Sequence, residues 1–179
     1  MSTPKEWGEL LDKQQIAEVL FRYCRGIDRN DIELALDAFH PDALDNHTGR
    51  PIPVAEVARR LRDPARGVLK AVTHSLSNIL IDLEGDVAHS EAYFLANHRF
   101  SHENKDLYWI VAGRYLDRLE RRKQVWRIAD RRAVFDWERL EEAAPGPPGV
   151  AVARAIEGAL RGRADRSDPS YEVAPRAQR

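Results

Sequence analysis

The hydrophobic pattern of this chain changes its period once, and that change decides the fold class. Up to about residue 66, apolar residues recur at three- and four-residue spacing, as on one face of an α-helix. From Val68 onward they alternate with polar residues, which is the period of a strand with one buried face. Helices followed by a run of strands predict an α+β domain, in which a curved antiparallel sheet carries the N-terminal helices on its concave face.

Three helices are expected before the change of period. Gly26 and the polar residues after it mark the end of the first, which has the clearest apolar stripe. Pro41 stops the second, and Pro53 suits the first turn of the third. The helices are expected over residues 16–27, from an N-cap at Asn30 or Asp31 to Pro41, and over 51–66.

Four strands are expected after the change of period, joined as a meander. Glu84-Gly85-Asp86 has the composition of a tight turn, and two further polar stretches separate the later strands. The strands are expected over residues 70–83, 87–101, 107–119 and 125–137.

The chain is expected to hold one domain and a C-terminal extension. Residues 1–144 form the domain, and the proline- and glycine-rich run from Pro145 to Gly149 is a linker. Val150 to Arg161 has the pattern of a short helix. The polar residues from Gly162 to Arg179 are expected to be mobile unless a neighbouring subunit holds them.

Composition narrows the function classes. The 179 residues carry a formal net charge of −1, and the chain has no basic stripe interleaved with aromatic residues, so nucleic-acid binding is not expected. Cys24 is the only cysteine, which excludes an internal disulfide and fits a reducing cytoplasm. We expect a cytoplasmic protein, because the N-terminus lacks a signal-peptide pattern and no apolar run is long enough to span a membrane.

A carboxylate and an imidazole are expected to meet inside the domain. Asp28 lies at the end of the first helix, where the helix dipole disfavours an acid, so local stability does not explain it. His74 is in phase with Val72 and Leu76 and points inward with them. Taken singly, Asp28 fits an exposed or capping acid, and His74 fits a hydrogen-bonded core residue. Facing one cavity, the two side chains would be able to move a proton near neutral pH.

Other polar residues join this candidate site. Tyr23 lies on the apolar stripe of the first helix, either as plain packing or as a hydrogen-bond donor to a substrate oxygen. His98 is in phase with inward residues of the second strand. Either Arg131 or Arg132 faces the interior of the last strand, where it would neutralise Asp28, bind an anion or form a structural salt bridge. His40, His47, His89 and His102 are weaker candidates, and His47 is expected in a loop.

Several kinds of site find no support in the sequence. There is no His-Glu-x-x-His run and no pair of cysteines, so no metal is expected. There is also no glycine-rich phosphate loop and no Gly-x-Ser-x-Gly elbow, so neither nucleotide chemistry nor a serine nucleophile is expected. No cofactor is expected.

Four motifs in sequence order resemble the SnoaL-like branch of the nuclear transport factor 2-like superfamily, over Lys13 to Arg139. This resemblance implies a cone-shaped α+β barrel, a fold that hosts several functions. The motifs are the Tyr-Cys-x-x-x-Asp helix ending at Asp28, the segment from Asp31 to Ala43, the Thr-His-x-x-x-Asn strand from Thr73 to Asn78, and the Trp-Arg-Ile-x-x-Arg-Arg strand from Trp126 to Arg132.

Within the superfamily the chain is most similar to the dehydratase and dehydrochlorinase group, which uses an aspartate–histidine dyad without a cofactor. The resemblance implies that His74 is the general base and Asp28 its partner. It also implies that Tyr23 donates a hydrogen bond, that His98 is a second histidine, and that Arg131 is the late-strand arginine, or Arg132 if a bulge shifts the register.

The leading function is therefore a cofactor-independent lyase (dehydratase) or isomerase acting on a hydrophobic ring compound such as a polyketide, steroid or aromatic. The alternative is a non-catalytic ligand-binding or assembly subunit, like the small subunit of ring-hydroxylating dioxygenases. An epoxide hydrolase is a third possibility, although the sequence shows no strong candidate for its second acid. The open sheet and the resemblance together imply a homodimer or homotrimer.

Overall fold

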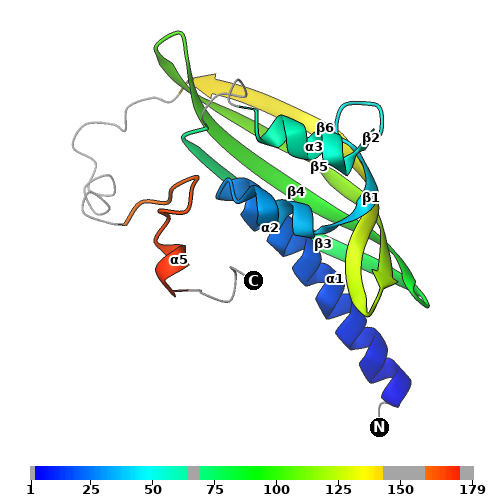
Figure 1. Ribbon diagram of the computed structural model, residues 1–179. Helices are drawn as coiled ribbons and strands as arrows, with labels where there is room; N and C mark the ends of the chain where they lie inside the picture. Colours follow the sequence, from blue (N-terminus) through cyan, green and yellow to red (C-terminus); the bar gives the residue numbers. More distant parts are fainter. Residues whose placement is uncertain (1–2, 64–68, 143–159, 174–179) are drawn as a thin grey trace.

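The computed structural model describes residues 3–63, 69–142 and 160–173 (Figure 1). The described elements form one curved, unclosed sheet with the N-terminal helices packed against it. In chain order they are α1 (Pro4–Asp28), α2 (Ile32–Asp37), β1 (Phe39–Asn46), β2 (Ile52–Pro53), α3 (Val54–Leu61), β3 (Ala71–Glu84), β4 (Val87–His102), β5 (Lys105–Arg122), β6 (Val125–Glu142) and α5 (Ser170–Val173).

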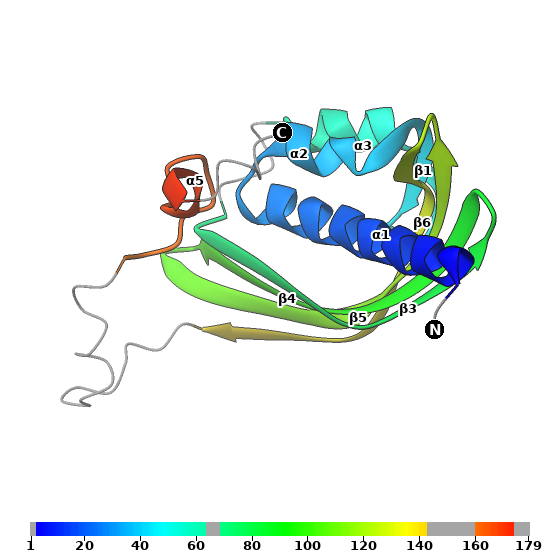
Figure 2. The same ribbon diagram turned by 90° about the horizontal axis from the view of Figure 1, so that it is seen from below.

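The sheet has six strands in the order β2-β1-β6-β5-β4-β3. Strands β3 to β6 form the predicted antiparallel meander, and Gly85, with φ of 65°, makes the turn between β3 and β4. Figure 2 shows α1 lying across the concave side of this meander, as the change of period predicts. The α+β fold class and the cone-like arrangement are confirmed.

Strand β1 was not predicted, because the sequence analysis ends the second helix at Pro41 and expects no strand there. In the structure α2 ends at Asp37, and β1 pairs in parallel with β6. The sheet is therefore mixed rather than purely antiparallel. The pairing shifts register between Phe39 and Leu44, and an irregularity of this kind is where a strand tolerates a proline.

The hydrophobic core lies between the buried stripe of α1 and the concave face of the sheet. Ile16 and Leu20 of α1 and Leu119 and Ile128 of the sheet are completely buried. The helix starts at Pro4, where Thr3 forms a capping box with Glu6. Its exposed first turns extend beyond the sheet in Figure 1, so the packed part of α1 is its C-terminal half.

The described part of the C-terminal extension packs against this chain's own helices. The buried carboxylate of Asp31, which caps α2, accepts hydrogen bonds from Arg166 at 3.1 Å and from the Tyr171 hydroxyl at 3.0 Å. Arg29 forms an ion pair with Asp168 at 3.3 Å. The linker and nearly all of the expected helix over 150–161 lie outside the described residues. None of the helices in the described ranges has the length and hydropathy of a membrane-spanning segment.

Gly26 lies near the end of α1, as predicted, and it also marks the crossing of α1 with α2. Helix α1 continues to Asp28, and the chain reverses at Asn30, whose φ is 48°. A Cβ atom added at Gly26 would lie 2.4 Å from the backbone nitrogen of Ala35 in α2. Only a residue without a side chain therefore lets the two helices approach this closely, and their packing holds the end of α1 in place.

We predict opposite effects for the same substitution at two glycines of α1. Gly26→Ala should lower the free energy of unfolding by about 1–3 kcal/mol, because the methyl group overpacks the α1–α2 contact. Gly8→Ala should raise it by about 0.5–1 kcal/mol, because nothing lies within 4 Å of the added atom and alanine favours the helix. Urea denaturation followed by tryptophan fluorescence measures both, and equal effects at the two positions would contradict the crossing argument.

Candidate active site

A cavity of about 350 Å³ opens on the concave side of the sheet. Its walls come from the end of α1, the segment from β1 to α3, and strands β3 to β6. Most of the lining is apolar, and its phenyl, phenol and indole side chains are those of Tyr23, Phe94, Trp109, Tyr115 and Phe135. A volume in this range and an apolar lining with a few polar groups are typical of small-molecule sites.

His74 lines this cavity, and its side chain is in direct contact with that of Asp28 behind it. The Nδ1 atom of His74 lies 2.6 Å from Oδ1 of Asp28, and the two side chains are 6% and 11% exposed. A carboxylate accepts hydrogen bonds, so Nδ1 carries the proton and donates it. The lone pair of the neutral ring is then on Nε2, the nitrogen opposite the carboxylate.

The position of His74 at a sheet edge explains why an acid is tolerated at the end of α1. Among the described strands, β3 pairs only with β4, so alternate backbone N–H groups of β3 point away from the sheet. The backbone N–H of His74 donates to both carboxylate oxygens of Asp28, at 3.1 and 3.0 Å. Asp28 thus satisfies an edge-strand donor and orients the imidazole with the same carboxylate.

His98 and Tyr23 lie in the same cavity. The His98 ring is 5.7 Å from the His74 ring and nearly perpendicular to it, and its Nδ1 donates to the Trp109 carbonyl at 3.3 Å. Burial raises the pKa of the Tyr23 hydroxyl well above its usual value, although Arg131 acts in the opposite direction. Tyr23 therefore remains a protonated hydrogen-bond donor.

Arg131, and not Arg132, faces the interior of the sheet. Its guanidinium lies 4.2 Å from the ring centres of both Tyr23 and Tyr115 and makes two hydrogen bonds to Asp117, at 2.8 and 2.7 Å. Burial by itself would lower the pKa of Arg131, but the charge of Asp117 outweighs it and raises that pKa. Arg131 thus pairs with Asp117 rather than Asp28 and lies behind the tyrosines that line the cavity.

The sequence analysis missed a second histidine–aspartate pair. Nδ1 of His47 donates to Oδ1 of Asp45 at 2.6 Å, and both residues line the cavity. His47 was expected to be a loop residue of little interest. It directly follows β1, and the Asp-x-His spacing places both side chains on one side of an extended chain, which would have been a usable signal had the strand been predicted.

Cys24 is not an available nucleophile. The thiol is buried beside Tyr23, and burial raises its pKa to about 12, with the Asp28 carboxylate adding to the shift and Arg131 opposing it. Within the described part of the chain, no three histidine, cysteine or acidic side chains gather closely enough to hold a metal ion.

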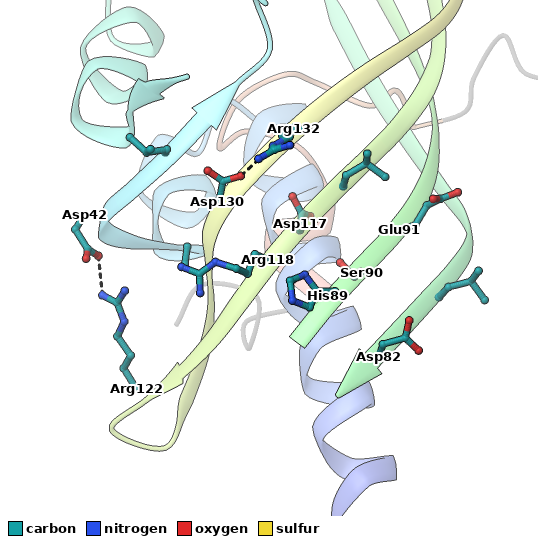
Figure 3. Close-up of a pocket in the computed structure, with 14 residues that line it drawn as sticks. Asp42, Asp82, His89, Ser90, Glu91, Asp117, Arg118, Arg122, Asp130 and Arg132 are labelled. Carbon is teal, nitrogen blue, oxygen red and sulfur yellow. Dashed lines mark hydrogen bonds and ion pairs between the residues drawn. The ribbon is translucent and has the colours of Figure 1, made fainter. Parts of the chain in front are cut away.

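A larger hollow, of about 750 Å³, lies on the outer face of the sheet (Figure 3). Asp82 and Glu91 lie on one side of it, with His89 near the middle. The arginines on the other side include Arg122 and Arg132, which pair there with Asp42 and Asp130. Its rim is charged and it is open to solvent. The smaller concave cavity, with its apolar walls and buried proton-transfer groups, is the better candidate for a ligand site.

Comparison with known proteins identifies relatives of this fold. The sequence model of one family, the SnoaL-like domain, matches residues 8–132. None of the curated proteins compared with the chain matches it significantly. Three solved structures illustrate the likeness. Two of them are less than 25% identical to this chain, so their similarity is evidence for the fold alone.

The first is a candidate scytalone dehydratase from Novosphingobium aromaticivorans, with 22% identity, a TM-score of 0.66 and coverage of 80% of this chain and 97% of the other. The second is Rv3472 of Mycobacterium tuberculosis, of unknown function, with 27% identity, a TM-score of 0.60 and coverage of 82% and 84%. The third is hexachlorocyclohexane dehydrochlorinase LinA-type3 from Novosphingobium barchaimii, with 14% identity, a TM-score of 0.67 and coverage of 80% and 99%.

We predict that the buried pair behind the cavity is essential for stability. Asp117→Ala should lower the free energy of unfolding by about 3–5 kcal/mol, because it leaves the charge of Arg131 buried without a partner. The matched control is Asp130→Ala, which breaks a surface pair with Arg132 at 3.5 Å and should change stability by about 1 kcal/mol or less. Urea denaturation checks both, and a similar cost at the two sites would contradict the prediction.

Proposed function

The chain belongs to the SnoaL-like domain family, within the nuclear transport factor 2-like superfamily, and we propose that it is a cofactor-independent lyase or isomerase. Its substrate is a hydrophobic ring compound with a carbonyl group, and the simplest reaction of this kind is dehydration. The observation that carries the proposal is the 2.6 Å contact between Asp28 and His74, a histidine that lines an aromatic cavity.

In this proposal His74 is the general base. Its Nε2 removes a proton from the carbon beside the carbonyl group, while Asp28 keeps the other nitrogen protonated and stabilises the imidazolium that forms. Burial of both side chains strengthens their attraction, because little water screens it. A base positioned in this way contributes about 10²–10⁴ in rate.

The remaining polar groups handle the negative charge that proton removal creates. The Tyr23 hydroxyl donates a hydrogen bond to the carbonyl oxygen as that oxygen becomes negative. Arg131 acts as a positioning residue, since its guanidinium stacks on the Tyr23 ring and fixes the ring's orientation. His98, whose ring contacts that of His74, holds a water molecule or a substrate oxygen next to the base.

The substrate class follows from the lining. Aromatic side chains bind a flat or puckered ring by its faces, and the volume of the cavity suits a compound of one or two fused rings. The names of two structural neighbours, a candidate scytalone dehydratase and a hexachlorocyclohexane dehydrochlorinase, also describe elimination reactions.

We predict that the protein accelerates hydrogen–deuterium exchange at C2 of 1-tetralone, a two-ring ketone without a leaving group. His74→Gln should lower this rate by about 10²–10⁴, because glutamine cannot accept the proton. Proton NMR in D₂O measures the exchange directly.

His89→Gln is the matched control, because His89 lies on the outer face of the sheet and should leave the rate unchanged. Far-ultraviolet circular dichroism checks that both variants are folded. Exchange at the wild-type rate in the His74 variant would exclude His74 as the base. Exchange no faster than in buffer, with 1-tetralone bound, would favour the non-catalytic binding module.

We further propose that the protein forms a homodimer or homotrimer through the outer face of the sheet. Leu80 is 67% exposed and Leu95 is 45% exposed on this face. The acidic and basic side chains that line the outer hollow in Figure 3 would form ion pairs with charged groups of a second copy.

Light scattering should therefore give a mass two or three times that of the 20.4 kDa chain. The double variant Leu80→Asp and Leu95→Asp should be a monomer, because it places charges in the apolar part of the interface. Leu10→Asp, on the projecting start of α1, should keep the wild-type mass. A monomeric wild type would overturn this proposal.

A further inference from the structure

We propose that His47, held by Asp45, is the general acid of the reaction and protonates the leaving oxygen while His74 removes the carbon-bound proton. This inference rests on the proposed function, because it adds a second proton-transfer group to the same cavity. His47 lies in the loop after β1, as expected, and the inference gives it a role there. His98 is the rival candidate for the acid.

The His47–Asp45 pair has the same internal geometry as the His74–Asp28 pair. In both, Nδ1 lies 2.6 Å from a carboxylate oxygen, so Nε2 is the nitrogen left to face a ligand. Asp45 is 3% exposed, and the His47 ring lies 5.7 Å from that of Tyr115 and 6.5 Å from that of Phe135. His47 is therefore fixed among the aromatic side chains that would bind a ring.

The two pairs reach the cavity from opposite margins of the sheet, on the same concave face. His74 is in β3, at one edge, and His47 follows β1, which is separated from β3 by β6, β5 and β4. The sheet curves around the helices, so its two margins face a common space (Figure 2). Because both histidines line that space, a ring bound there has one imidazole on each side.

Burial decides which histidine is the acid. The His47 side chain is 29% exposed and that of His74 is 6% exposed, so a positively charged ring is less costly to desolvate at His47. Asp28 divides its charge between the imidazole and a backbone N–H. Among the described residues, Asp45 accepts a hydrogen bond only from His47, so its charge acts more fully on that ring.

The other titratable groups around His47 come from several elements. The same cavity is lined by Arg60 of α3, Tyr23 of α1, Tyr115 of β5, His74 of β3 and His98 of β4. Arg60 pairs with Glu56 at 2.9 Å, which reduces its repulsion of a second cation. Both tyrosines have pKa values raised by burial and stay neutral.

The proposed step is balanced for a β-hydroxy ketone. His74 Nε2 takes the proton from the carbon next to the carbonyl group, and the C–H electron pair becomes the new carbon–carbon double bond. The carbon–oxygen bond breaks, its electrons stay on oxygen, and the oxygen receives the Nε2 proton of the His47 imidazolium and leaves as water. His74 then returns its proton through solvent and His47 regains one, so no net proton is consumed.

Dependence on the leaving group tests this role. The probes are 3-hydroxy-1-tetralone, which loses water to give 1-naphthol, and 3-acetoxy-1-tetralone, which loses acetate to give the same fluorescent product. Hydroxide is a poor leaving group whose loss is strongly accelerated by protonation, whereas acetate is a good leaving group and needs no acid. His47→Gln should therefore slow water loss by about 10²–10⁴ and change acetate loss by less than about threefold. Asp45→Asn should show the same selectivity, because it removes the charge that stabilises the imidazolium.

Other outcomes would separate this inference from the proposed function. Equal slowing of both probes by His47→Gln would assign His47 a structural role and overturn the inference. Selectivity in His98→Gln instead of His47→Gln would also overturn it and make His98 the acid. Wild-type rates on both probes in His74→Gln would overturn the proposed function itself, as would a wild-type protein that eliminates neither group.

Discussion

The carboxylate of Asp28 ties the end of helix α1 to the edge strand β3, and the geometry of the cavity depends on that contact. One oxygen holds the imidazole of His74, and both oxygens accept the backbone N–H of the same residue. The contact therefore stabilises the edge of the sheet and orients a candidate base. It also requires the end of α1 to lie in one place, which the close packing of Gly26 against α2 provides.

A second constraint lies behind the cavity. Arg131 and Asp117 are completely buried side chains, and two tyrosine rings cover the guanidinium. A pair of this kind contributes little net stability compared with apolar residues, but removing one partner is costly. It fixes the orientations of Tyr23 and Tyr115, so the cavity has a rigid polar wall as well as its aromatic ones.

Much of the fold was predictable from the sequence, and so was one of the two histidine–aspartate pairs, that of His74 with Asp28. The four long strands alternate clearly, and His74 inherits its direction from Val72 and Leu76. Strand β1 was missed because Pro41 is normally a stop signal and because its pairing with β6 joins residues far apart in the chain. Missing β1 hid the relation of His47 to the cavity, since a loop residue has no predictable direction.

The sequence by itself determined the periods of the elements, their order and the residue types available for proton transfer, because these are local properties. The tertiary structure decided which carboxylate pairs with which cation. Asp28 pairs with His74, Asp45 with His47, and Arg131 with Asp117 rather than Asp28. These choices depend on sheet curvature, on the register of β6 and on the depth of burial. They arise only when segments distant in the chain are packed together and water is excluded from between them.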